Sequence, residues 1–193
     1  MPELDLVGIF RTLQGEFGLR VDAVSDAQWG APTPNAEWDV ADLVGHLITE
    51  HRWVEPLMRG LDLDAAAGEV DAIRAAAVHD GYPDAWDDVA RRAGEAFSAP
   101  GALEQTVLLS RGPTVGGGYI RELIFDLTVH TWDLGRAIDW AGELPSDIVS
   151  AVWGESRQFT DLSASGMFDR PVVVPDDAPV LDRLIAMTGR DPR

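Results

Sequence analysis

The sequence predicts an all-α fold built on a four-helix bundle, with additional short helices and a short extended C-terminal segment. Apolar residues recur at spacings of three and four in four separate segments, the spacing typical of amphipathic helices. Stretches that contain proline or glycine separate these segments, as expected for loops between helices. The few short extended pieces would decorate the bundle and would not form its core.

Length and composition favour one domain. The chain has 193 residues, of which 46% are hydrophobic and 25% charged, which is ordinary for a globular protein that buries its own core. We therefore expect a single helical domain over residues 1–193. Residues from about 163 to 193 would form a C-terminal extension packed on that domain.

The first two helices have the clearest periodicity. Residues 4–24 form the first, with apolar side chains at regular helical spacing that include Phe10 and Phe17. The second begins after Asp39, a residue type preferred as an N-cap, and runs to about Gly60.

The middle of the chain predicts a further helix and a short extended piece. Residues 61–81 are rich in alanine and aspartate and are predicted to be helical in part. Residues 84–98 form the third main helix, which Pro100 and Gly101 end. Residues 106–109 are predicted to be extended.

The fourth main helix is predicted from Tyr119 to about Trp140. We expect a loop before it, because Gly112, Pro113 and the run 116–118 are turn formers.

Three further elements follow the fourth helix. A fifth helix opens at Pro145 and Ser146 and is predicted to reach about residue 161. Residues 172–174 lie between two prolines and are predicted to be extended. A last short helix spans about residues 179–188, with Asp177 as its candidate cap.

Composition excludes several classes of function. The chain has no cysteine, which excludes disulfides, cysteine-ligated metals and a cysteine nucleophile. Its net charge of −18 disfavours nucleic acid and anionic membrane surfaces as partners. Neither a signal peptide nor a run of about 18 apolar residues is present, so a cytoplasmic location without a membrane span is expected.

Three side chains form a candidate metal site. Asp126 and His130 are four residues apart in the fourth helix and share a face, and His46 lies on the apolar side of the second helix. Two imidazoles and one carboxylate suit zinc, nickel, manganese or iron(II), and three protein ligands leave a position open for water or substrate. The alternative is that Asp126 and His130 form a buried structural pair and that His46 is a core histidine.

Glu50 and the remaining histidines have less specific patterns. Glu50 follows His46 by one helical turn, and it could be a fourth ligand, a partner of a ligand histidine, a general base or a solvated surface residue. His51 is expected to be exposed, one residue away from the apolar stripe. His79 is expected in a surface loop.

Trp53 and several arginines are candidates for binding a ligand. Trp53 lies two turns after His46 and could form the wall of a pocket, whereas the other tryptophans are expected to be core and loop anchors. Arginines that could bind an acidic ligand are Arg52, Arg59, Arg111, Arg121 and Arg136. In so acidic a chain, most of them are expected to form surface ion pairs.

Two stretches resemble motifs of the DinB-like superfamily, in the branch related to mycothiol-dependent maleylpyruvate isomerase. They are residues 32–47 (PTPNAEWDVADLVGHL) and residues 126–137 (DLTVHTWDLGRA). The C-terminal tail from Val174 also resembles actinobacterial relatives. The resemblance implies a four-helix bundle with a divalent metal, usually zinc, whose ligands carry over to His46, Asp126 and His130. The isomerase has glutamate where this chain has Asp126.

The resemblance also implies a chemistry. Enzymes of this branch use a low-molecular-weight thiol such as mycothiol, which the metal would hold as thiolate. The chain would then transfer sulfur to, or isomerise, a small electrophile, with Glu50 as a catalytic residue and with Arg52 and Trp53 contacting the thiol. The isomerase has a sizeable second domain that this chain lacks, so S-transfer is the broader expectation. The alternative is a non-catalytic metal- or ligand-binding protein with a stress or regulatory role. A homodimer is plausible for either.

Overall fold

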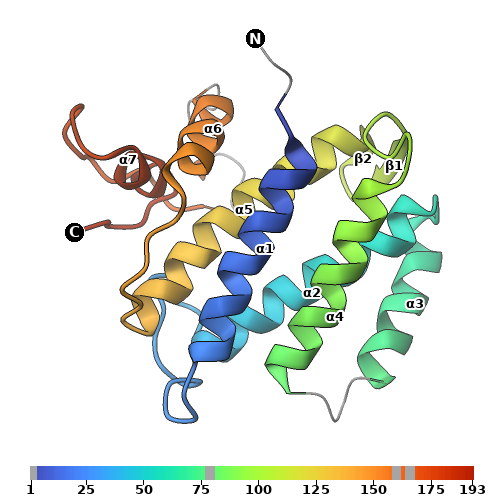
Figure 1. Cartoon of the computed structure of the whole chain (residues 1–193), viewed down its shortest axis with the longest axis horizontal. Helices are drawn as coiled ribbons and strands as arrows, with labels where there is room; N and C mark the ends of the chain where they lie inside the picture. The colour runs from blue at the N-terminus through green and yellow to red at the C-terminus, as the bar shows by residue number, and fades with distance from the viewer. Residues whose placement is uncertain (1–3, 77–80, 158–161, 164–167) are drawn as a thin grey trace.

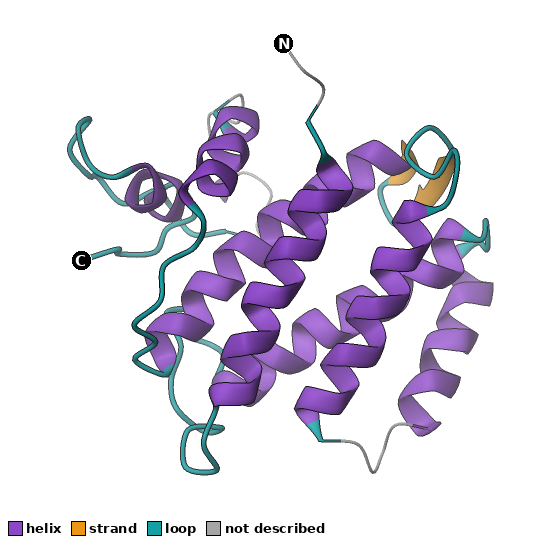
Figure 2. Cartoon of the chain, in the orientation of Figure 1, coloured by secondary structure: helices purple, strands orange, loops and turns teal. Residues whose placement is uncertain are grey.

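The computed structural model describes residues 4–76, 81–157, 162–163 and 168–193. This part of the chain is mostly helical, with one small two-stranded sheet (Figure 2). Four long helices confirm the predicted bundle: α1 (Leu6–Ala23), α2 (Val40–Met58), α4 (Tyr82–Ser98) and α5 (Gly116–Ala137). Helix α1 packs between α4 and α5, and α2 packs against both α4 and α5 (Figure 1). Helix α3 (Leu63–Ala76), in the segment predicted to be partly helical, packs on α2.

The apolar faces of α1 and α4 meet through aromatic rings. Phe10 and Phe17 of α1 are fully buried, and so are Trp86 and Phe97 of α4. The ring centroids of Phe17 and Trp86 lie 4.6 Å apart, and those of Phe10 and Phe97 lie 5.4 Å apart. Burial of a large apolar side chain stabilises a protein by about 1.5–3 kcal/mol, so these rings hold the two helices together.

Helix α2 begins where the sequence places its cap. The Asp42 amide donates to Asp39 Oδ1 at 2.9 Å, and the Asp39 amide donates to Asp42 Oδ2 at 3.3 Å. This reciprocal capping box satisfies two amides that a helix N-terminus leaves unpaired. It fixes the start of the helix that carries His46.

The segment before α5 differs from the prediction. Residues predicted as a loop form strand β2 (Gly112–Val115), which pairs antiparallel with β1 (Thr106–Leu109). Gly116–Gly118 is the first turn of α5 and not part of the loop. At Gly116 the backbone of another segment comes close: an added Cβ would lie 2.0 Å from the Ala102 carbonyl oxygen. Glycine is therefore required here for close packing, and the helix begins three residues earlier than its apolar pattern.

The Gly116→Ala variant is expected to be destabilised. The added methyl group would clash with backbone, which cannot move aside as a flexible side chain can, and overpacking of this kind costs about 1–3 kcal/mol. Urea unfolding should show this loss, whereas Gly154→Ala on α6, where the added Cβ would have no described atom within 4 Å beyond the adjoining helix backbone and chain neighbours, should not lose stability. Equal stability of the two variants would contradict the steric argument.

The C-terminal part of the chain adds α6 (Ser146–Ser156) and α7 (Val180–Ala186), which pack on each other, and α6 also contacts α5. Helix α6 ends at Ser156, and residues 158–161 of its predicted range lie outside the described residues. Asp177 does not cap α7: the N-cap is Pro179, which makes no side-chain hydrogen bond. Residues 172–174 form no strand with any described neighbour, and the Val172 amide donates to the Ala186 carbonyl at 2.9 Å.

Among the described residues, none of the helices combines the length and the apolar character needed to span a membrane.

Candidate metal centre

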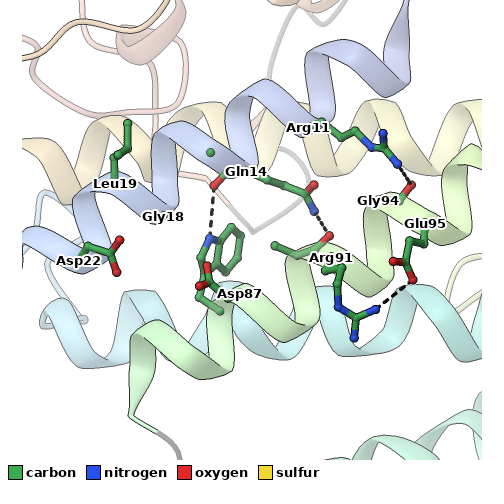
Figure 3. A pocket seen from close by; sticks show the side chains of 12 residues that line it. Arg11, Gln14, Gly18, Leu19, Asp22, Asp87, Arg91, Gly94 and Glu95 are labelled. Carbon is green, nitrogen blue, oxygen red and sulfur yellow. Dashed lines mark hydrogen bonds and ion pairs between the residues drawn. The ribbon is translucent and has the colours of Figure 1, made fainter.

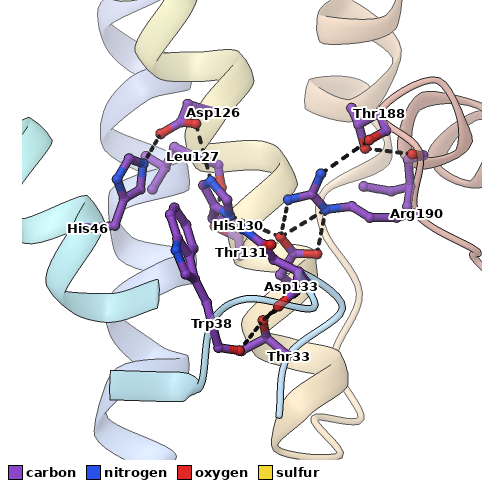
Figure 4. A network of polar contacts seen from close by, with 12 residues as sticks. Thr33, Trp38, His46, Asp126, Leu127, His130, Thr131, Asp133, Thr188 and Arg190 are labelled. Atoms are coloured by element: carbon purple, nitrogen blue, oxygen red, sulfur yellow. Dashed lines mark hydrogen bonds and ion pairs between the residues drawn. The ribbon is translucent and has the colours of Figure 1, made fainter. Parts of the chain in front are cut away.

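Helices α2 and α5 bring His46, Asp126 and His130 together (Figure 4). The Asp126 carboxylate lies between the two imidazoles. Its Oδ2 is 3.5 Å from His46 Nε2, and its Oδ1 is 3.3 Å from His130 Nε2. The side chains of His46 and Asp126 are 29% and 28% exposed, whereas that of His130 is 6% exposed. The group therefore lies at the edge of the core, where a small molecule can reach it.

The spacing of the donor atoms fits one metal ion. All three residues offer a ligand atom within 4.8 Å of the others. Ligand atoms at about 2.1 Å from a tetrahedral zinc ion lie about 3.4 Å from one another, and each imidazole Nε2 lies at about this distance from one oxygen of Asp126. Within the part of the chain that the structure describes, this geometry includes these three side chains and not Glu50. Three ligands of this kind leave at least one coordination position open.

Trp38 borders the two imidazoles. Its ring centroid lies 4.7 Å from that of His46 and 5.4 Å from that of His130. The loop before α2 holds it there, because Thr33 Oγ1 donates to the Trp38 carbonyl at 2.9 Å. Trp38 was expected to be only a core or loop residue. The sequence feature that indicates a place beside the site is its position in the same stretch as Asp39 and His46.

His130 is held at both ring nitrogens. Its Nδ1 lies 3.0 Å from Asp133 Oδ2, which leaves Nε2 facing Asp126. Burial lowers the pKa of His130, but the two neighbouring carboxylates outweigh it and raise this pKa to about 9. Burial would raise the pKa of Asp126, but His130 and His46 lower it below its usual range. A metal binding here would therefore displace a proton from His130 at neutral pH.

Glu50 is half-buried on α2, one turn after His46. Burial raises the pKa of Glu50, His46 and His130 oppose this increase, and Asp126 adds to it. Glu50 is thus electrostatically coupled to all three candidate ligands. This environment differs from that of a fully solvated surface glutamate.

His51 corrects a sequence prediction. It was expected to be exposed but is 1% exposed, because it continues the buried stripe of Val44, Leu47 and Ile48. Its Nδ1 lies 2.8 Å from the Leu47 carbonyl oxygen, and its ring stacks on Phe10 at 5.5 Å. His51 therefore belongs to the core, whereas His46 lies at the edge of the stripe and faces α5.

The other predicted ligand-binding residues are placed as follows. Trp53 is half-buried against the core of the bundle, and Arg52 is half-buried beside it in the sequence. Surface ion pairs occupy three of the arginines, as expected: Arg59 with Glu69, Arg111 with Glu122 and Arg121 with Glu155. His79 lies outside the described residues.

A separate groove of about 440 Å³ lies between α1 and α4 (Figure 3). Its two arginines are engaged within it: Arg11 donates to the Gly94 carbonyl at 3.4 Å, and Arg91 donates to Glu95 at 3.0 Å. None of the candidate ligands lines this groove. The groove is therefore separate from the candidate metal centre at the α2–α5 interface.

Fold and donor set together define a helical-bundle protein with a candidate divalent-metal centre between two helices. The family model for the mycothiol maleylpyruvate isomerase N-terminal domain matches residues 10–135, which include His46, Asp126 and His130. The chain belongs to this family.

Two relatives and a solved structure resemble this chain over most of its length. Two uncharacterized proteins from Mycobacterium tuberculosis strains CDC 1551 and H37Rv are each 27% identical over 185 residues, covering 93% of this chain and 94% of theirs. The crystal structure of the mycothiol-dependent maleylpyruvate isomerase has a TM-score of 0.62 at 17% identity. That match covers 90% of this chain and 75% of the isomerase chain. It confirms the predicted DinB-like bundle fold.

Proposed function

We propose that this protein is a metal-dependent enzyme that uses a low-molecular-weight thiol, mycothiol, to transfer sulfur to or isomerise a small electrophile. The observation that carries the proposal is the His46–Asp126–His130 donor set in a chain of the mycothiol maleylpyruvate isomerase N-terminal domain family. The isomerase structure is longer than the part this chain matches, so we favour S-transfer as the broader activity.

The three side chains would hold the ion through His46 Nε2, His130 Nε2 and an Asp126 oxygen. A bound divalent metal, for which we propose zinc as the family resemblance implies, would lower the pKa of a thiol at the open position and keep it as thiolate. Trp38 would cover one side of the imidazoles and limit the access of water. The exposed edges of His46 and Asp126 leave room for the thiol and the electrophile.

Glu50 is our candidate for proton transfer. It would accept the proton that the thiol loses on binding and return it to the carbon next to the new C–S bond. In an isomerisation, rotation about the former double bond would follow. Glu50 would then remove the proton from that carbon, the thiol would leave, and Glu50 would return the proton to the thiol. Arg52 and Trp53, on the same helix, would contact the thiol or an acidic group on the substrate.

Activity and metal content test the proposal separately. Protein purified without a metal-binding tag should contain about one equivalent of metal and should convert maleylpyruvate or a simple alkylating electrophile only when mycothiol is present. Glu50→Gln should keep the metal and reduce turnover about 10²–10⁴-fold, the usual contribution of a general base. Glu37→Gln, in an exposed loop position, is the matched control.

Two outcomes would contradict the proposal in different ways. Metal binding without thiol-dependent turnover on any electrophile would leave a non-catalytic metal-binding protein. Turnover that is unchanged in Glu50→Gln would remove Glu50 from the mechanism while leaving the metal centre in place.

A further inference from the structure

Asp133 is a buried carboxylate that links the candidate metal centre to the C-terminal segment (Figure 4). Its side chain is 0% exposed, and Oδ2 lies 3.0 Å from His130 Nδ1. Arg190 forms a bidentate ion pair with the same carboxylate: Nε donates to Oδ1 at 2.8 Å, and a terminal nitrogen donates to Oδ2 at 2.8 Å. A chain of contacts thus runs from Arg190 through Asp133 to His130.

We propose that Asp133 and Arg190 act as positioning residues that orient the His130 ring for metal binding and make metal affinity depend on the C-terminal segment. The inference rests on the metal centre of the proposed function. A carboxylate at Nδ1 fixes ring rotation and leaves Nε2 directed at the metal position, and such partners strengthen metal binding by histidine.

Arg190 gives this arrangement its rigidity. A carboxylate fully removed from water needs a charged partner, and Arg190 supplies one from a side chain that is only 10% exposed. The guanidinium matches both carboxylate oxygens, so the pair restricts rotation of Asp133 more than a single hydrogen bond would. Without Arg190, the Asp133 carboxylate would keep its contact with His130 Nδ1 but could turn away from it more easily.

The Arg190 side chain reaches Asp133 from beyond the matched family region. Arg190 lies 57 residues after Asp133, past α7, whereas the family match ends at residue 135. The third nitrogen of its guanidinium donates to the Thr188 carbonyl at 3.4 Å. Thr188 is itself buried, and its hydroxyl donates to the Ile185 carbonyl at 2.7 Å. The end of α7 therefore anchors the arginine, and the C-terminal segment completes the surroundings of His130.

Zinc affinity and cobalt absorption test the inference on the full-length, metal-free protein. Competition with a coloured chelator should show zinc affinity reduced about 10–100-fold in Asp133→Asn and in Arg190→Gln, with Arg190→Lys between Arg190→Gln and the wild type. The visible absorption of bound Co²⁺, which reports ligand geometry, should change in the same variants. Arg193→Gln, which removes an exposed ion pair with Asp191 in the same segment, should leave both measurements unchanged.

A double variant separates positioning from folding. Arg190→Gln alone leaves the Asp133 charge buried without its arginine, so the thermal midpoint of unfolding is expected to fall. Asp133→Asn combined with Arg190→Gln removes that charge and should recover much of the lost thermal midpoint. The proposal requires the zinc affinity of this double variant to remain reduced. A folded double variant with wild-type zinc affinity and cobalt spectrum would overturn the positioning role of Asp133 and Arg190 without affecting the assignment of the metal centre. A wild-type protein that binds no zinc would overturn both.

Discussion

Replacing Asp126 with asparagine is expected to reduce zinc affinity by more than about 100-fold, beyond the loss typical of residues that only support a ligand. Asp126 is the anionic member of the donor set and lies within 3.5 Å of both imidazoles. Asparagine keeps the shape but removes the negative charge that attracts the cation. His46→Ala should have an effect of similar size, because it removes the ligand that α2 supplies. Chelator competition on metal-free protein measures both.

The same variants distinguish a metal centre from a structural ion pair. If Asp126 and His130 only stabilise the bundle, wild-type protein should bind no zinc and Asp126→Asn should lower its thermal midpoint. Asp147→Asn, an exposed substitution in the first turn of α6, controls for loss of negative charge elsewhere. Zinc affinity that falls equally in Asp147→Asn and Asp126→Asn would contradict the assignment of Asp126 as a ligand.

Acid destabilisation through His51 is the second large effect expected. Burial lowers the pKa of His51 to about 4, from 6.5, although its bond to Leu47 acts in the opposite direction. Above pH 6.5 the residue is neutral in both folded and unfolded states and contributes no pH dependence. As pH falls below 6.5, the unfolded state takes up a proton that the folded state excludes, so stability decreases until about pH 4. The whole loss is about 3 kcal/mol, of which about 2 kcal/mol should occur by pH 5.

The His51→Phe variant should lack this part of the pH dependence. Phenylalanine can keep the stacking on Phe10, and Nε2 of His51 has no hydrogen-bond partner among the described residues that its removal would strand. Urea unfolding of both proteins at pH 7.5 and pH 5, with chelator present, gives the difference directly. His130 has a folded pKa of about 9 and so affects stability between pH 6.5 and 9, but it does so in both proteins and cancels from the difference between them. An identical loss in both proteins would contradict the prediction.

Local sequence pattern predicted the parts of the molecule that depend on neighbouring residues. The spacing of apolar residues placed four long helices, and Asp39 marked the start of α2. Asp126 and His130 are one turn apart, so any helix at that position puts them on one face. Helical spacing therefore predicts Asp126 and His130 as a pair, whereas His46 is predicted from the apolar stripe of a different helix.

The sequence predictions were wrong at positions where several helices or loops pack together. Periodicity alone could not separate the buried His51 from the half-exposed His46, because α2 is covered by α1 and α4 on one side and meets α5 on the other. The glycine run is predicted as a loop, yet it opens α5, and Gly116 is a glycine because the Ala102 backbone approaches it closely. Both outcomes depend on distances between residues far apart in the chain.

The sequence by itself determined the helical bundle and the residue types available for a metal, because these follow from periodicity and composition. Only the tertiary structure decided which side chains surround the three candidate ligands. Trp38 comes from a loop, Asp133 from the buried face of α5, and Arg190 from the C-terminal segment. An ion pair across 57 residues leaves no periodic signal in the sequence, since it depends on how the segment after α7 packs back against α5.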